Sequence, residues 1–177
     1  QAYFESVAES FHQFCEDADD VERLLVREEL SDHERIMCGI AKQAGASDYR
    51  LFQNAGYRGM YNMDLRRLKE VKRVDADRSL LDFMTKLELA ANLFRITQTE
   101  AKIRNGRVQG QKNLEAIAEQ VGRTVRNTMI EISGDRPEDL RVSEDLRLIR
   151  SNLKKTSRDF DRLDASSTSE NIPYPDP

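Results

Sequence analysis

Residues 85–100 read TKLELAANLFRITQTE, and this stretch carries the clearest fold signal in the chain. Apolar side chains cover most of its circumference, and four polar residues recur three or four positions apart: Glu88, Asn92, Arg95 and Thr99. This spacing places them on one face of an α-helix. A helix that is apolar nearly all round is typically buried. The stretch therefore predicts a central helix whose polar face either forms an internal hydrogen-bond network or lines a ligand groove.

Helical periodicity extends on both sides of this stretch, and no run of alternating residues indicates a strand. The sequence predicts an all-α fold, a compact or elongated bundle of about five to seven helices over residues 1–163. Thr85 followed by Glu88 is a capping-box pattern at the start of the central helix. Another long helix is predicted at 111–133, because Gly134 supplies its stop. Residues 164–177 (DASSTSENIPYPDP) are rich in Ser and Pro and predict a disordered tail.

The first 45 residues form one kinked helix or three short ones. An apolar stripe runs to about Cys15, Asp17 and Asp20 can restart a helix, and Ser31 with Glu34 is a second capping-box pattern. Gly45 then ends the helix. The first residues, QAYF, read as the middle of a helix, so we expect the chain to be the C-terminal portion of a longer protein.

Shorter helices are expected at 64–74 and 79–84, and a last helix is expected after Ser143, which is its predicted cap. The last helix has a strict 3-4 apolar seam made of Leu146, Ile149, Leu153, Thr156, Phe160 and Leu163. Such a seam fits antiparallel packing inside the bundle or a short coiled coil between chains.

Composition argues against several classes of protein. No apolar run approaches the ~18 residues of a membrane span, and no signal peptide is visible. Cys15 and Cys38 read as free buried thiols, typical of a reducing cytoplasm. His12 and His33 lie too far apart for a zinc site, and no phosphate-binding loop or nucleophile elbow is present. The sequence therefore predicts a protein that is not an enzyme, with no metal, no cofactor and no small-molecule substrate.

Charge is distributed unevenly along the chain. Residues 1–34 contain eleven acidic groups against two arginines, whereas a basic cluster lies in the middle of the sequence. The nucleic-acid-binding candidates are Arg58, Arg66, Arg67, Lys69, Lys72 and Arg73. Lysines and arginines in such a cluster could neutralise phosphates, in which case binding should weaken steeply with salt. The simpler interpretation is that these are ordinary solvated helix faces.

Residues 52–61 read FQNAGYRGMY and are predicted to form a compact irregular loop, because Gly56 and Gly59 should break a helix. Tyr57 and Tyr61 beside Arg58 could stack on nucleobases, as in single-strand binders. They could equally fill a gap between helices. In that case the amides of Gln53 and Asn54 are candidate acceptors for Arg95.

Four sequence blocks together resemble the DNA damage-inducible protein D family: FQNAGYRGMY, LELAANLFRITQTEAKI, VGRTVRNTM and the GDRPEDL turn. The order of the blocks also agrees, and the resemblance covers about residues 1–142. The last helix and the tail resemble the family poorly. The matching motif positions, which form the predicted structural network, are Gln53, Asn54, Gly56, Tyr57, Gly59, Tyr61, Asn92, Arg95 and Gln98.

This resemblance implies a role in the bacterial SOS response. It also implies that a BRO-like domain precedes the segment and that a RecA-type recombinase filament on single-stranded DNA is the partner. Function is then modulation of recombinational repair by binding the filament, single-stranded DNA, or both. The alternative is an oligomerisation scaffold that pairs two upstream antirepressor-like DNA-binding domains, which requires a homodimer.

Overall fold

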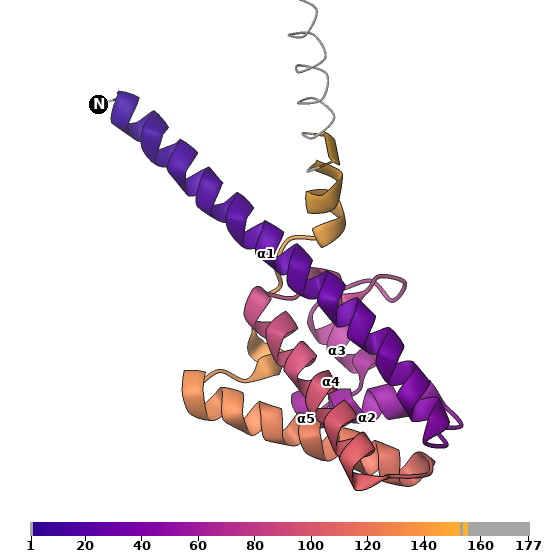
Figure 1. The fold of residues 1–177 in the computed structure, drawn as a ribbon. Coiled ribbons are helices and arrows are strands. Elements are labelled where there is room, and N and C mark those ends of the chain that lie inside the picture. Colours follow the sequence, from indigo (N-terminus) through magenta and orange to yellow (C-terminus); the bar gives the residue numbers. More distant parts are fainter. Residues whose placement is uncertain (1, 153, 156–177) are drawn as a thin grey trace, which may run out of the picture.

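The computed structural model describes residues 2–152 and 154–155, with side chains from residue 18 onward, and the elements in this part of the chain are all helical (Figure 1). The predicted all-α bundle is confirmed. Its elements are α1 (Ala2–Gln43), α2 (Tyr49–Tyr61), α3 (Leu65–Val71), the 3-10 helix η1 (Leu80–Phe83), α4 (Lys86–Gly106), α5 (Gln111–Ser133) and the 3-10 helix η2 (Pro137–Asp139). Residues 146–152 are also helical. The predicted tail and the second half of the predicted seam lie outside the described residues.

Helix α1 is a single continuous helix of 42 residues, and its N-terminal half projects beyond the bundle (Figure 1). The restarts predicted near Asp17 and at Ser31 are therefore wrong. The Ser31 hydroxyl donates to the Arg27 carbonyl, 3.2 Å away, one helical turn back, so it does not cap a helix. Gly45 ends the helix as expected, with a left-handed φ of 85°.

The prediction of a loop at residues 52–61 is wrong, because the segment lies inside α2. Asp48 caps this helix through its carboxylate, which accepts from the backbone N–H groups of Arg50 and Leu51. Gly56 and Gly59 are helical and buried. A glycine inside a helix costs only about 1 kcal/mol relative to alanine, so tertiary packing can override it.

That packing is the crossing of α2 over α5, in which glycines let two backbones touch. A Cβ atom on Gly59 would lie 2.1 Å from the Glu119 carbonyl oxygen. A Cβ on Gly122, in the middle of α5, would lie 2.6 Å from the Gly56 carbonyl oxygen. Neither helix can carry a larger side chain here without separating from the other.

Helix α4 runs alongside α1, and α5 crosses α4 obliquely after the short connection at residues 107–110 (Figure 1). Thr85 caps α4 as predicted, since its hydroxyl accepts from the Glu88 N–H at 3.2 Å. The second half of the predicted capping box does not form, because the Glu88 carboxylate bonds Lys72 instead. The predicted bounds of α5 are confirmed, with Gly134 at its end in a left-handed conformation.

Residues 141–145 lead from η2 into the helical segment 146–152. The predicted cap at Ser143 is wrong. The Ser143 N–H donates to the Phe83 carbonyl at 2.8 Å, and the Asp145 carboxylate accepts from the Arg147 N–H at 3.0 Å, so Asp145 caps the segment. Leu146 and Ile149 are buried in the main core, which supports intramolecular packing for this half of the seam.

Candidate functional site

The polar stripe of α4 lies inside the bundle and is built around Asn92, which is fully buried. The Asn92 amide nitrogen donates to the Tyr61 hydroxyl at 2.7 Å and to the Glu88 carbonyl at 3.0 Å. Its amide oxygen accepts from Arg95 Nε at 3.3 Å and Nη2 at 3.2 Å. The acceptors predicted for Arg95 were backbone carbonyls or the amides of Gln53 and Asn54, but the structure places the Asn92 amide oxygen there.

Arg95 also contacts two residues of α2, Tyr57 and Gly56. Its guanidinium carbon lies 5.2 Å from the centre of the Tyr57 ring, within the range of a cation–π contact. On another side lies Gly56, where a Cβ atom would come within 2.2 Å of Arg95 Nη1. Tyr57 in turn stacks on Tyr61, with ring centres 5.8 Å apart. The tyrosines therefore fill the interior in this structure, and burial raises the pKa of both hydroxyls.

A buried ion pair lies at the N-terminal end of the stripe, where Glu88 contacts Lys72. Lys72 Nζ lies 3.1 and 3.2 Å from the two carboxylate oxygens of Glu88, and it also donates to the Leu140 carbonyl at 2.9 Å. The two side chains are 3% and 0% exposed, so neither can meet a ligand in solution. Burial raises the pKa of the Glu88 carboxyl, and the Lys72 ammonium and a hydrogen bond with Tyr61 partly offset that rise.

The three remaining motif positions serve different parts of the fold. The Asn54 amide oxygen accepts from the Leu65 N–H at 3.2 Å and so positions the start of α3. Gln53 donates to the Glu34 carboxylate of α1 at 3.3 Å. Burial raises the pKa of Glu34, and the neighbouring cations and Gln53 lower it in part. Gln98 is exposed and lines a groove on the outer side of α4.

The structure separates the predicted nucleic-acid-binding residues. Lys72 is buried, as described above. Arg58 lies on α2 and faces α5, where its guanidinium is 3.8 Å from Glu115 and 3.6 Å from Glu119. Only four of the six candidates remain together on or beside α3: Arg66, Arg67, Lys69 and Arg73.

Carboxylates are interleaved with these four cations. Glu70 pairs with Arg66 at 3.5 Å and with Arg67 at 3.0 Å. Asp64 precedes these residues, and Asp75 and Asp77 follow them. Arg78 forms an ion pair with Asp145. Four cations therefore face four carboxylates over residues 64–77 once the internally paired Lys72 is set aside. This surface has little net positive charge for a phosphate backbone.

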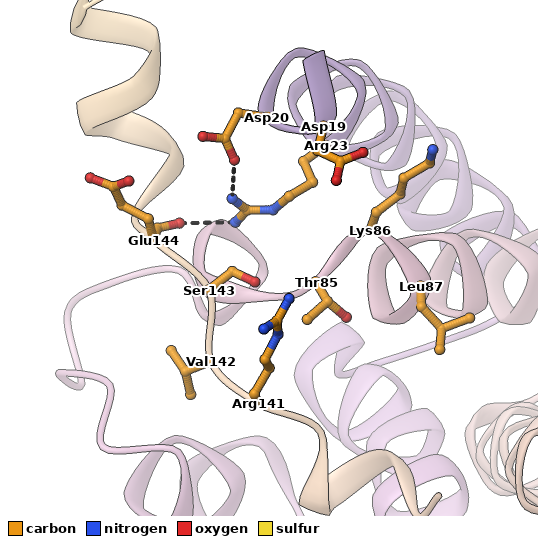
Figure 2. A pocket seen from close by; sticks show the side chains of 10 residues that line it. All are labelled: Asp19, Asp20, Arg23, Thr85, Lys86, Leu87, Arg141, Val142, Ser143 and Glu144. Carbon is orange, nitrogen blue, oxygen red and sulfur yellow. Dashed lines mark hydrogen bonds and ion pairs between the residues drawn. The ribbon is translucent and has the colours of Figure 1, made fainter. Parts of the chain in front are cut away.

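Two surface grooves could receive a partner. The first, of about 500 Å³, lies where α1, the start of α4 and residues 141–144 meet (Figure 2). Arg23 forms one wall and joins three segments, since it donates to the Met84 carbonyl at 3.2 Å, the Asp20 carboxylate at 2.8 Å and the Glu144 carbonyl at 2.9 Å. Three cations and three carboxylates line this groove, so it favours neither sign of charge.

The second groove, of about 650 Å³, lies between the outer faces of α4 and α5 and is more apolar. It is lined by Phe94, Gln98, Ala101, Lys102, Asn105, Gly106, Val121, Thr124 and Val125. Phe94 is 54% exposed, which is unusual for a large aromatic residue in the middle of a helix. Exposed aromatic residues beside a groove are typical of protein–protein contact sites.

Comparison with known proteins identifies a matching family and a relative. The DinD C-terminal domain model matches residues 17–149. The chain is also 40% identical over 136 residues to DNA damage-inducible protein D of Escherichia coli (strain K12). The chain belongs to the DinD C-terminal domain family. The alignment covers 75% of the chain but 48% of the relative, so the chain spans about half the length of the relative it matches.

In this DinD C-terminal domain, the family match covers the bundle, from the body-contacting part of α1 to Ile149. Among the described residues, no helix is long and apolar enough to cross a membrane. No group of three His, Cys, Asp or Glu residues in that part of the chain could hold a metal ion.

Sequence reasoning missed several residues that shape the domain. Gly122 carried no expectation, although a glycine in the middle of a strongly amphipathic helix is a signal of close backbone approach. Arg126 was not assigned a role, yet it forms a buried ion pair with Glu138 and donates to the Met60 carbonyl at 3.1 Å. The roles of Lys72 and Arg23 depend on residues distant in sequence, so no local pattern could have indicated them.

Proposed function

We propose that this domain is a non-enzymatic module of the DNA damage response that modulates recombinational repair by binding a RecA-type recombinase filament on single-stranded DNA. Family membership supports the DNA damage response part of this proposal. The observation that carries the binding mode is the contrast between two surfaces: the α3 surface is neutralised, whereas the α4–α5 groove exposes Phe94. We therefore place the main contact on protein and not on phosphate.

The groove residues explain how such a contact could form. Phe94 supplies an aromatic anchor, Val121 and Val125 supply an apolar floor, and Lys102 and Gln98 supply hydrogen-bond donors at the edge. An apolar centre with a polar rim is the usual anatomy of a protein interface. Direct contact with single-stranded DNA through Arg66, Arg67, Lys69 and Arg73 is the secondary mode of the proposal.

Binding without turnover is part of the same proposal. The polar side chains of the α4 stripe, which a catalytic site could use, form hydrogen bonds and an ion pair inside the bundle. Glu88 pairs with Lys72, Asn92 bonds Tyr61 and Arg95, and Thr99 donates to the Arg95 carbonyl at 2.7 Å.

A fluorescence anisotropy titration tests the proposal, using labelled single-stranded DNA with and without a preformed recombinase filament. We expect the domain to bind the filament much more tightly than bare DNA. Phe94→Asp should weaken filament binding at least about tenfold, equivalent to ~1.4 kcal/mol. Ile132→Asp is the matched control, because Ile132 is a more exposed apolar residue at 81% that does not line the groove.

Three results together would contradict the proposal: equal binding of bare DNA and the filament, a steep loss of binding with salt, and no binding by the triple variant Arg66→Ala, Arg67→Ala and Arg73→Ala. They would show that the contact is made with phosphate and that the groove is not the main interface. Lys72 stays unchanged in this variant, because its substitution would disturb the core.

A further inference from the structure

The N-terminal half of α1 extends beyond the rest of the molecule (Figure 1). Its first described contacts with other elements are made by Glu22, which pairs with Lys86, and by Arg23. Toward its C-terminal end the helix is anchored by Leu30, Met37 and Ala41, which are buried in the core. An isolated helical segment of this length is marginally stable in water, so a partner would stabilise it.

The projecting half has an apolar stripe. Its positions are spaced three and four residues apart over residues 4–25 and hold Phe4, Val7, Phe11, Phe14, Ala18, Val21 and Leu25. This is the heptad pattern of a coiled-coil seam. Where side chains are described, the stripe is open: Ala18 is exposed, Val21 is 38% exposed and Leu25 is 60% exposed. Helical geometry places it nearly opposite Arg23 and Leu30, which face the body.

The helical segment at residues 146–152 of the same chain does not cover this stripe. It runs along a flank of α1, where Arg150 pairs with Glu28 at 3.0 Å and Leu146 shares a groove with Arg27 and Ser31. Around α1, Glu28 lies roughly 60° from Leu25, Ser31 roughly 120° and Arg27 roughly 160°. The segment therefore lies to one side of the stripe and leaves Leu25 60% exposed. Farther along this flank, positions 6, 10, 13 and 17 are Ser, Ser, Gln and Asp, so the flank becomes polar where the stripe is most apolar.

We propose that the stripe over residues 4–25 is a dimerisation surface and that its occupant is the same stripe of a second copy, running antiparallel. The charges that flank the seam select this direction. Asp17 and Glu22 flank it at the end near the body, whereas the other end is flanked by Tyr3, Ala8, Ser10 and Cys15. In a parallel pair, Asp17 of each copy would face Glu22 of the other, which is repulsive. An antiparallel pair brings Asp17 and Glu22 of each copy against the uncharged flanking positions of the other.

The size of the seam is adequate for a specific dimer. Three phenylalanines per copy bury about 150 Å² or more each, so the six rings alone contribute roughly 900 Å². The leucine and valines bring the total toward the ~1,200 Å² at the lower end of stable interfaces. The inference does not rest on the proposed function, since the α4–α5 groove lies on other elements.

Light scattering on the whole chain tests the proposal. We expect a mass that reaches twice the monomer value as concentration rises. Val21→Asp with Leu25→Asp should yield a monomer, and Ala18→Asp should do the same by a smaller change. Ile132→Asp should leave the dimer intact. Thermal unfolding should show that the variants remain folded, because the three substituted positions are exposed.

A short thiol crosslinker tests the direction, in a Cys38→Ser background that leaves Cys15 as the remaining cysteine. Cys15 lies near the middle of the stripe. An antiparallel pair should therefore bring the two copies of Cys15 to the same side of the seam, where the reagent crosslinks them efficiently.

Added salt should strengthen the dimer, because it screens repulsion between acidic arms. A monomer at all concentrations, or a dimer that survives Val21→Asp with Leu25→Asp, overturns the proposal. A dimer without the Cys15 crosslink overturns its direction.

Discussion

The polar stripe of α4 and the surface of α3 contain similar residue types but use them in opposite ways. On α4, Asn92, Arg95 and Glu88 are buried, and each has defined partners at hydrogen-bond distance. On α3, Arg66 and Arg67 are mostly exposed and share one partner, Glu70. Lys72 stands between the two regions, since it follows α3 in sequence but belongs to the interior.

The difference shows that charge in the sequence does not by itself identify a binding surface. A buried polar group needs its partners, because an unpaired one costs about 1–3 kcal/mol. An exposed ion pair contributes about 0–1 kcal/mol, because water already solvates both groups. The same arginine or lysine therefore has a structural role inside the bundle and a solvation role outside it. Four substitutions would break or sharpen this contrast.

The largest effect is expected for Lys72→Met. It would leave Glu88 buried without its partner, and we expect a loss of ~3–5 kcal/mol in the free energy of unfolding, measured by urea denaturation. Adding Glu88→Leu should recover much of the loss, because no buried charge then remains. If Lys72→Met instead lowers the free energy of unfolding by only about 0–1 kcal/mol, as the loss of an exposed ion pair would, the Lys72–Glu88 pair is not a buried structural element.

The pH dependence of the same variant supplies a further check. Burial raises the pKa of Glu88 above its ordinary value of 4.5, so the folded state binds its proton more readily than the unfolded state. Ionisation of this carboxyl therefore reduces stability as pH rises from the unfolded pKa through the folded pKa. Without the Lys72 ammonium the folded pKa should rise further. We expect the cost of Lys72→Met to grow as pH rises above 4.5, the ordinary pKa of this carboxyl.

The next largest effect is expected for Gly59→Ala, which tests whether α2 and α5 can move apart at their crossing. The new methyl group would meet the Glu119 carbonyl, and α2 would have to move off α5, at a cost of about 3 kcal/mol. Gly39→Ala in α1 is the matched control, since nothing lies within 4 Å of its added Cβ. This control should be neutral or stabilising by up to about 1 kcal/mol. Equal effects at the two glycines would contradict the close crossing.

A smaller effect is expected for Tyr61→Phe, which removes one hydrogen bond from the network and leaves the ring in place. Asn92 would lose an acceptor at 2.7 Å, and the expected cost is ~1–2 kcal/mol in urea denaturation. Tyr49→Phe should cost less, because the Tyr49 hydroxyl bonds the Glu34 carbonyl at a longer 3.3 Å and is only partly buried.

The smallest effect is expected for Arg66→Ala with Arg67→Ala on α3. Both guanidinium groups are mostly exposed, so the free energy of unfolding should change by less than about 0.5 kcal/mol. Filament binding should also change little if the groove at Phe94 is the main contact. A large loss of stability would show that the surface of α3 is part of the folded network.

Part of this architecture follows from local sequence. The cap at Thr85, the stops at Gly45 and Gly134, and the bounds of α5 depend on neighbouring residues alone. The predicted loop at residues 52–61 was wrong for the complementary reason. Glycines are weak helix formers in isolation, and only the presence of the α5 backbone beside Gly56 and Gly59 shows why they lie in a helix.

The candidate site divides in the same way. The 3-4 spacing of Glu88, Asn92 and Arg95 was sufficient to place them on one face, and the four motif blocks were sufficient to indicate the family. Their partners were not predictable. The stripe is contacted by residues from outside α4: Lys72, Tyr61 and Gly56. Lys72 is 16 positions from Glu88 in sequence, and Tyr61 is 31 positions from Asn92.

By itself, the sequence determined the helical class, most helix ends and the family, because these depend on periodicity, capping chemistry and short motifs. Only the tertiary structure decided which polar residues are interior and which cations remain on the surface. The physical reason is that desolvation depends on what surrounds a side chain in three dimensions. Lys72 and Arg73 are adjacent in sequence, yet Lys72 is buried against Glu88 and Arg73 is exposed to solvent.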